Sequence, residues 1–232
     1  MNSLYNISIQ LYVIAIRFAA LFNAKAKLWV NGKKNILQKI EEVTKGEQNI
    51  VWFHCASLGE FEQGKPIIET YKQKYPKHKI LLTFFSPSGY EIRKNYKGAD
   101  WVFYLPADTQ ANAKRFISIV NPIKVVFIKY EFWFNYMNEL KKKNIPFYSV
   151  STTFRKEQVF FKYKWFAKQL NNVSHFFVQD KNSKELLINI GFSNCTVAGD
   201  TRFDSVISNT QNSIRIPLIE IFSKNKNCCS WF

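Results

Sequence analysis

Small and acidic residues follow the first strongly apolar run of this sequence. Ile50–Cys55 leads into Ala56, Ser57, Leu58, Gly59 and Glu60. The small residues at Ser57 and Gly59 allow a backbone turn to approach a ligand closely. We expect Glu60 at the start of a following helix, where the helix dipole and free N–H groups favour the ionised carboxylate and keep its pKa low. Such a carboxylate is a candidate general base.

The same residues have a purely structural alternative. Ser57 and Glu60 have the S-x-x-E spacing of a capping box, in which each side chain hydrogen-bonds the backbone N–H of the other residue. That motif stabilises a helix start and needs no ligand. The spacing alone leaves both interpretations open.

Hydroxyl groups and a glycine follow the next apolar run, Lys79–Phe85. Ser86 and Gly89 belong to the sequence Ser-Pro-Ser-Gly. These residues suit contacts with a sugar or a phosphate, but a helix cap is the simpler interpretation.

Two later segments bring opposite charges together. Lys129, Glu131 and Trp133 follow the run Lys124–Ile128, and core packing explains two charges and an indole at a strand end poorly. Further on, Arg202 lies between two aspartates. We treat both segments as candidate sites.

Alternating strand and helix patterns position these residues. The predicted strands are Ile50–Cys55, Lys79–Phe85, Trp101–Tyr104, Lys124–Ile128, Phe147–Ser151, His175–Val178 and Thr196–Ala198. The predicted helices between them are Phe61–Tyr75, Thr109–Val120, Phe132–Lys143, Val159–Leu170 and Ser183–Ile190. Many strands are apolar throughout, as expected when helices cover both faces of a sheet. The pattern predicts an α/β fold with a parallel sheet, which binds ligands at the carboxyl ends of its strands.

The first residues predict an amphipathic helix. Its apolar stripe comprises Leu4, Ile7, Leu11, Ile14, Ala15, Phe18, Leu21 and Phe22. Asn6, Gln10 and Arg17 lie on the opposite face, and lysines with Trp29 follow. This combination favours a helix lying in a membrane interface, with docking onto the protein's own domain as the alternative.

Charge and composition limit the classes of function. The 232 residues carry a formal net charge of +16, which indicates an anionic partner such as a phospholipid surface, a phosphorylated substrate or nucleic acid, although general compositional drift towards lysine is an equal explanation. A nucleic-acid binder is disfavoured because the sequence has no recognition motif of that class.

The sequence indicates neither a metal site nor a disulfide framework. The spacing of the 4 cysteines and 3 histidines suits neither, and each histidine is more readily explained as a buried, hydrogen-bonded residue. Phosphate loops with Gly-rich motifs are also missing.

A second basic segment interleaves lysines with aromatic residues between residues 141 and 168. Phe160, Phe161, Trp165 and Phe166 cover too wide an arc of one helix for a narrow core stripe. We therefore favour a surface role for these rings, with core packing as the alternative.

Four of these segments together carry a family resemblance. HCASLGE, TFFSPSG, KYEFW and GDTRFD, in this order and spacing, resemble the N-terminal half of bacterial 3-deoxy-D-manno-octulosonic acid (Kdo) transferases. The similarity runs from about residue 4 to about residue 207. It implies the first of two facing Rossmann-like domains, the GT-B arrangement. It also implies inverting transfer of Kdo from CMP-Kdo to the 6′-hydroxyl of a lipid A precursor, without metal or cofactor. The expected location is the cytoplasmic face of the inner membrane, on an anionic surface, with no nucleic-acid partner.

The resemblance also assigns roles to residues. Glu60 matches the catalytic base, and Lys129 and Arg202 match positions that stabilise the transition state. Lys129 departs from the family pattern, since many members have Glu there. Either charge is redistributed in this chain, or Lys129 contacts a substrate phosphate. The expected substrate-binding residues are Ser57, Gly59, Ser86, Gly89 and Glu131.

The expected organisation has three parts. Residues 1–34 form the membrane-associated helix with its basic flank, 35–207 the acceptor-binding domain, and 208–232 an interdomain start or truncated tail. Since the donor-binding domain is absent from this pattern, we expect little or no sugar transfer by this chain alone. The alternatives are a catalytically inert, anionic-lipid-binding Rossmann-like module and a different GT-B glycosyltransferase.

Overall fold

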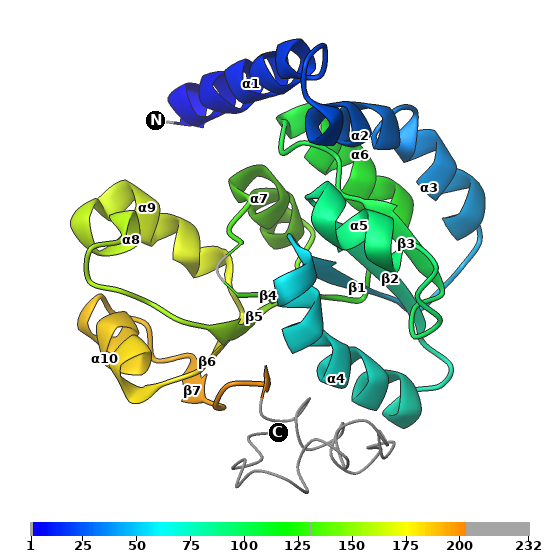
Figure 1. The fold of residues 1–232 in the computed structure, drawn as a ribbon. Helices are drawn as coiled ribbons and strands as arrows, with labels where there is room; N and C mark the ends of the chain where they lie inside the picture. The colour runs from blue at the N-terminus through cyan, green and yellow to red at the C-terminus, as the bar shows by residue number, and fades with distance from the viewer. Residues whose placement is uncertain (1, 130, 203–232) are drawn as a thin grey trace, which may run out of the picture.

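The centre of the protein is a parallel sheet of seven strands (Figure 1). The structure is a computed structural model that describes residues 2–129 and 131–202. The strand order is β3-β2-β1-β4-β5-β6-β7. The strands are β1 (Ile50–Cys55), β2 (Lys79–Phe84), β3 (Trp101–Tyr104), β4 (Lys124–Ile128), β5 (Phe147–Thr152), β6 (His175–Val178) and β7 (Cys195–Val197). The predicted fold class, a Rossmann-like parallel sheet flanked by helices, is therefore confirmed.

Helices precede the sheet and connect its strands. They are α1 (Asn2–Ala19), α2 (Ala24–Gly32), α3 (Ile36–Thr44), α4 (Leu58–Lys74), α5 (Pro87–Arg93), α6 (Gln110–Val120), α7 (Phe134–Lys142), α8 (Val159–Lys162), α9 (Lys164–Gln169), the 3₁₀ helix η1 (Leu170–Asn172) and α10 (Lys181–Asn189). Helices α2 and α3 were not predicted from the sequence; polar residues interrupt the apolar pattern of α2, and α3 is short.

Two apolar clusters cover the two faces of the sheet. Figure 1 shows α4 on one side of the sheet and α6 and α7 on the other. Along β1, Trp52 packs into the cluster that α6 and α7 cover, whereas Val51 and Phe53 pack into the cluster that α4 covers. Every residue of β1 is buried. Double coverage explains why this strand is apolar throughout instead of alternating.

The chain order reverses beside β1. After β3, the chain crosses back so that β4 pairs with the free side of β1. This reversal is the topological switch point of a parallel sheet, where the connections leave β1 and β4 in opposite directions and open a crevice at their carboxyl ends. The residues after β1 and after β4 therefore meet at this edge.

The predicted helix Val159–Leu170 is interrupted in the structure. At Tyr163 the backbone is extended, with φ −127° and ψ 119°, and the two short helices α8 and α9 lie on either side. The interruption turns α9 so that rings from both helices reach the core. Phe160 packs on Phe132, and Trp165 packs on Phe134.

The prediction that these rings serve the surface was therefore wrong. It assumed one straight helix, on which the rings cover too wide an arc for a core stripe. The lysines of the same segment are exposed, as core packing with solvated charges requires: Lys162, Lys164 and Lys168.

Helix α1 docks on the domain through the side that carries Tyr5, Asn6 and Tyr12. The Tyr5 hydroxyl donates a hydrogen bond to Asp108 Oδ2 at 2.5 Å, and the Asn135 amide donates to Asn6 Oδ1 at 2.9 Å. The predicted apolar stripe faces away: Leu4 is 70% exposed and Phe18 is 68% exposed. Within the described ranges, no helix is long and apolar enough to cross a bilayer.

Candidate functional site

The predicted catalytic residues meet at the carboxyl edge of the sheet. Glu60 lies in the first turn of α4, after β1, and Lys129 follows β4 directly. The charge of Lys129 lowers the pKa of both Glu60 and Asp200, and the charge of Glu60 raises the pKa of Glu131. These mutual effects place the four side chains in one electrostatic cluster. Tyr130, Phe203 and Asp204 of the four motifs lie outside the described residues.

The environment of Glu60 corrects one expectation. Its carboxylate accepts hydrogen bonds from the backbone N–H groups of Ala56 and Ser57, and these bonds lower its pKa, as does Lys129. Burial opposes them and is the largest effect, so the pKa of Glu60 lies above its ordinary value. The sequence argument considered the helix start and missed the removal of water. A carboxyl group whose pKa lies above its ordinary value accepts a proton more readily than a strongly acidic one, which suits general base catalysis.

One of the two hydrogen bonds of a capping box is present in the structure. The Glu60 carboxylate bonds the N–H of the N-cap residue Ser57. The Ser57 hydroxyl, in contrast, makes no capping bond with the described residues. Glu60 thus both caps α4 and faces the charged groups across the switch point.

Lys129 has an unusual backbone that the surrounding strands hold in place. Its φ of 63° lies in the left-handed region, which costs energy for a residue other than glycine. Its N–H donates to the Val150 carbonyl at 2.8 Å. Its carbonyl accepts from Ser149 Oγ at 3.0 Å and from Thr152 Oγ1 at 3.2 Å. This backbone therefore fixes the base of the Lys129 side chain between the ends of β1 and β5.

Glu131 is the second carboxyl group of the cluster. Burial and the charge of Glu60 raise its pKa to about 7, while the nearby Trp133 indole lowers it. Two carboxyl groups that repel each other titrate as a coupled pair, in which the charge of one raises the pKa of the other. Glu131 can therefore hold a proton beside Glu60, the residue expected to act as the base.

Arg202 is exposed and forms an ion pair with Asp200. Its Nε and Nη2 atoms both donate to Asp200 Oδ2, at 2.8 and 2.5 Å. Lys129, Arg155 and Arg202 line a polar pocket of about 640 Å³. The pocket offers three cations to an anionic group, with Glu157 among its lining residues.

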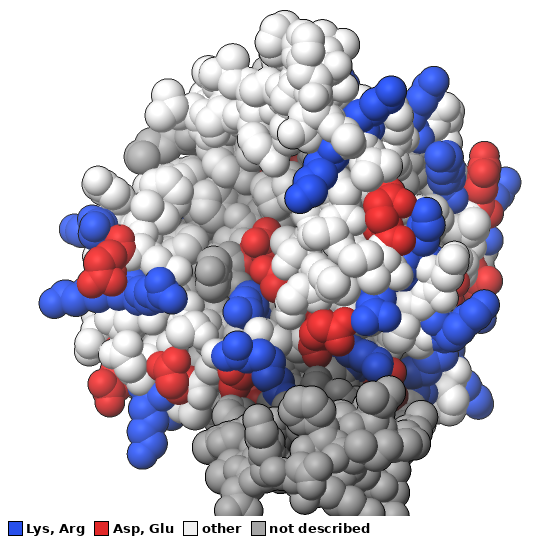
Figure 2. Space-filling model, viewed as in Figure 1, with Lys and Arg blue, Asp and Glu red and all other residues white. Residues whose placement is uncertain are grey.

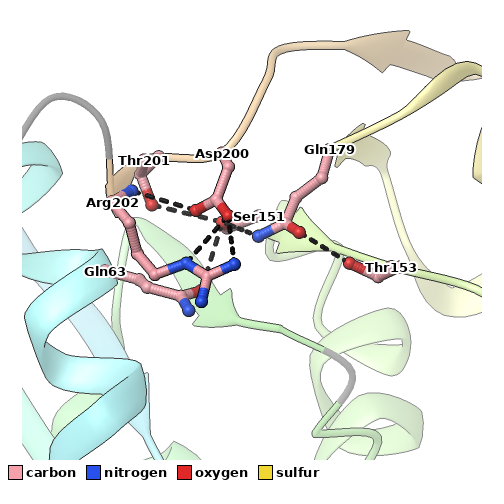
Figure 3. Close-up of polar contacts among 7 residues, drawn as sticks. All are labelled: Gln63, Ser151, Thr153, Gln179, Asp200, Thr201 and Arg202. Carbon is pink, nitrogen blue, oxygen red and sulfur yellow. Dashed lines mark hydrogen bonds and ion pairs between the residues drawn. The ribbon is translucent and has the colours of Figure 1, made fainter.

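A hydroxyl and amide network supports the turn that carries Arg202 (Figure 3). Ser151 Oγ donates to Gln63 Oε1 at 3.3 Å, exchanges a bond of 3.2 Å with Thr201 Oγ1, and accepts from Gln179 Nε2 at 2.9 Å. The network joins α4 to the ends of β5 and β6 and to the segment after β7. Sequence reasoning missed these residues, although Ser151 and Gln179 stand at predicted strand ends.

The remaining predicted substrate-binding residues differ in how far they are exposed to solvent. Ser86 is the N-cap residue of α5, but its hydroxyl makes no capping bond within the described part of the chain and instead bonds that of Ser88. The Ser86 N–H donates to the Ala56 carbonyl at 2.8 Å. Gly89 is buried, and a Cβ there would lie 2.3 Å from the Phe84 ring. Packing therefore requires a glycine at position 89. Gly59 is exposed, and a Cβ there would have no described atom within 4 Å.

The histidines have structural partners. His54 Nδ1 contacts Thr83 Oγ1 at 2.9 Å, and burial lowers the pKa of His54 to about 3. His78 bonds Tyr71, and His175 bonds Thr196. The described residues contain no cluster of His, Cys, Asp and Glu that could hold a metal ion. Cys228 and Cys229 lie outside the described part.

Comparison with known proteins identifies the family. A family model described as 3-deoxy-D-manno-octulosonic-acid transferase (kdotransferase) matches residues 16–205. The chain belongs to the Kdo transferase family. A Kdo transferase of Haemophilus influenzae is 33% identical over 98 residues, covering 42% of this chain and 23% of that protein. One of Aquifex aeolicus is 35% identical over 94 residues, covering 40% and 26%. The matched regions thus span about a quarter of these relatives' lengths.

A solved structure supports the fold of this Kdo transferase family member. UDP-N-acetylglucosamine 2-epimerase from Rickettsia bellii superposes with a TM-score of 0.55 at 13% sequence identity, over 75% of this chain and 51% of that chain. At such low identity the similarity concerns the fold alone.

Proposed function

We propose that this chain is the acceptor-binding half of a Kdo transferase that uses Glu60 as its general base. The arrangement of Glu60, Lys129 and Glu131 at the switch point between β1 and β4 carries the proposal. A buried carboxylate fixed by two backbone N–H groups and opposed by a lysine is suited to accept a proton from a substrate hydroxyl.

The proposed reaction is inverting transfer of Kdo from CMP-Kdo to the 6′-hydroxyl of a lipid A precursor. Glu60 takes the hydroxyl proton while that oxygen forms a bond to the anomeric carbon of Kdo, and the bond from that carbon to the phosphate oxygen of CMP breaks. Lys129 and Arg202 offset the negative charge of the leaving phosphate or of the Kdo carboxylate. A second domain would hold most of the CMP-Kdo, and the family resemblance implies that no metal is needed.

We further propose that the protein acts at the cytoplasmic face of the inner membrane, with α1 on the lipid surface. Figure 2 shows that α1 presents a largely uncharged surface, with Lys and Arg side chains beside it over α2 and α3. Exposed leucine, isoleucine and phenylalanine side chains beside cations favour contact with an anionic bilayer surface.

Replacement of Glu60 tests the catalytic proposal. Transfer is measured with the 232-residue chain, alone and with a separately produced donor-binding half of the Haemophilus influenzae relative. We expect Glu60→Gln to lower the transfer rate by about 10²–10⁴-fold, because the acceptor proton then lacks a base. Binding of the lipid acceptor should change little.

Glu69→Gln, on the outer surface of the same helix, is the matched control and should keep its activity. Activity of Glu60→Gln within a few-fold of wild type would favour the inert lipid-binding module, in which Glu60 serves α4 as a cap. Full turnover by the chain alone would contradict the proposed need for a donor-binding half.

A further inference from the structure

A cavity of about 610 Å³ lies between the N-terminal helices and the start of α6, away from Glu60. Lys33 and Trp29, which both line it, have buried donors: the Lys33 Nζ and the Trp29 Nε1–H have no hydrogen-bond acceptor among the described residues. Trp29 is 6% exposed. Buried donors are almost always satisfied in native proteins, so two of them beside one cavity indicate a site that accepts a ligand.

Aromatic rings hold the Lys33 amine in place. Its Nζ lies 3.9 Å from the centroid of the Trp29 ring, 4.1 Å from that of Phe85 and 5.8 Å from that of Tyr104. Burial lowers the pKa of the Lys33 amine, and cation–π contacts with these rings only partly offset the loss of water around its charged form. The rings do not supply the oxygen atoms that an ammonium group bonds in water, so an anionic ligand would favour the charged amine and add stabilisation that the rings cannot give.

Tight packing at Gly32 fixes this position. A Cβ at Gly32 would lie 2.2 Å from the Tyr104 ring, so the end of α2 lies directly on β3. Lys33 follows as the C-cap residue of α2. The backbone that carries the Lys33 side chain is therefore held against β3.

The rest of the cavity lining favours a negatively charged ligand. Arg17, Lys34 and Arg115 contribute three more cations, and no Asp or Glu is among the described lining residues. Arg115 pairs with Glu41 at 3.4 Å, outside the lining, where both side chains are half exposed. Thr109 and Asn112, at the N-terminus of α6, also line the cavity, where the helix dipole favours an anion.

We propose that this cavity binds a phosphate ester carried by a membrane lipid, with Lys33 and Trp29 as its buried donors. The phosphate chemistry follows from several converging cations and N–H donors, which suit a group with several acceptor oxygens. The lipid source follows from α1: Val13 and Arg17 of this helix line the cavity, and its exposed apolar stripe lies on the same helix. The phosphate site is independent of the proposed sugar transfer, whereas its lipid source rests on the proposed membrane contact.

The test follows the indole N–H signal of Trp29 by NMR during titration. Trp29→Phe assigns the signal. The probes are glycerol 3-phosphate in solution, and phosphatidylcholine vesicles with and without phosphatidic acid. We expect vesicles with phosphatidic acid to bind and to shift the signal saturably. Lys33→Met should weaken this binding by about tenfold or more, whereas Lys39→Met, an exposed lysine of α3, should stay within about twofold.

Each outcome decides one part of the proposal. Saturation by glycerol 3-phosphate with equal affinity would retain the phosphate site and overturn the lipid source. Equal weakening by Lys33→Met and Lys39→Met, or no saturable shift with any probe, would overturn the site itself. Thermal unfolding of Lys33→Met checks the fold. If Lys33→Met fails to fold, Lys33→Arg and Trp29→Phe replace it. Their binding to vesicles is measured by flotation, and retained affinity in both variants would contradict the proposal.

Discussion

At the scale of single residues, both carboxyl groups at the switch point have a raised pKa. Burial raises the pKa of Glu60 and of Glu131, and Lys129 counteracts this effect at Glu60. The Glu60–Glu131 repulsion means that the charge state of one group depends on the other. If Glu60 is the base, kcat/KM should fall on the acidic side with an apparent pKa above that of an ordinary carboxyl group.

The titration of Glu131 offers a direct prediction. Glu60→Gln removes a neighbouring negative charge, so the pKa of Glu131 should fall below its value of about 7. Because the pKa of Glu131 in the folded state exceeds its ordinary value of 4.5, its contribution to stability is full below that value and is lost as the pH rises through about 7. Glu60→Gln should therefore reduce the loss of unfolding free energy between pH 5 and pH 8.

Two measurements check this prediction. Carboxyl ¹³C NMR follows Glu131, and chemical unfolding at several pH values follows stability. Glu69→Gln serves as the control, since its side chain lies at the surface. A Glu131 titration near 4.5 in the wild type would contradict the proposed repulsion.

At the scale of elements, a buried aspartate joins α1 to α7. Asp108 is 1% exposed, and its carboxylate accepts from the backbone N–H groups of Asn135 and Tyr136 at 3.1 and 3.0 Å. The Tyr5 hydroxyl supplies a third donor from α1. Burial raises the pKa of Asp108 to about 7, and these three donors lower it. The same side chain thus caps one helix and anchors another.

Loss of the Tyr5 hydroxyl should loosen α1 and leave the α7 cap in place. We expect Tyr5→Phe to lower the unfolding free energy by about 1 kcal/mol and to speed hydrogen exchange in α1 several-fold. Mass-spectrometric exchange measures both helices separately. Tyr163→Phe, at an exposed position, is the control. Unchanged exchange in α1 would show that its apolar contacts alone hold it.

At the scale of the whole molecule, the polarity of α1 determines how the protein meets its surroundings. Tyr5 and Asn6 bond the domain, whereas the stripe that includes Leu4, Leu11 and Phe18 faces outward; in most surface helices the broad apolar stripe packs on the core. The proposed contact with a bilayer would remove these exposed side chains from water.

Vesicle flotation tests the membrane contact. The double change Leu11→Ser with Phe18→Ser should weaken binding to anionic vesicles at least about tenfold, since burying each side chain contributes about 1.5–3 kcal/mol. Ile188→Ser, at a position of α10 that is 50% exposed, should bind within about twofold of wild type. Equal losses in both variants would contradict a contact made through α1.

Much of the fold could be predicted because it depends on local patterns. The strands Ile50–Cys55, Trp101–Tyr104, Lys124–Ile128 and His175–Val178 were predicted with the bounds observed, since apolar runs between polar segments define them. Two of the other predicted strands differ by one residue at one end, and the last, Thr196–Ala198, is shifted by one residue from β7. The interruption at Tyr163 was missed because the sequence there has neither proline nor glycine.

The candidate site was predicted in position but not in its electrostatics. Strand ends place Glu60, Lys129 and Glu131 at one edge, which follows from topology alone. The direction of the Glu60 pKa shift was wrong because burial depends on neighbours distant in sequence. The packing role of Gly89 and the bonds of Ser151 depend on distant contacts as well.

The sequence by itself determined the parallel α/β sheet, the amphipathic first helix and the strand ends that carry the charged motifs. Periodicity and short motifs are local properties, and a single chain displays them directly. Tertiary structure decided which face of α1 meets the domain, how far burial raises the pKa of Glu60, and that Lys33 ends among aromatic rings. Each of these depends on the removal of water by residues far apart in the chain, which no local pattern encodes.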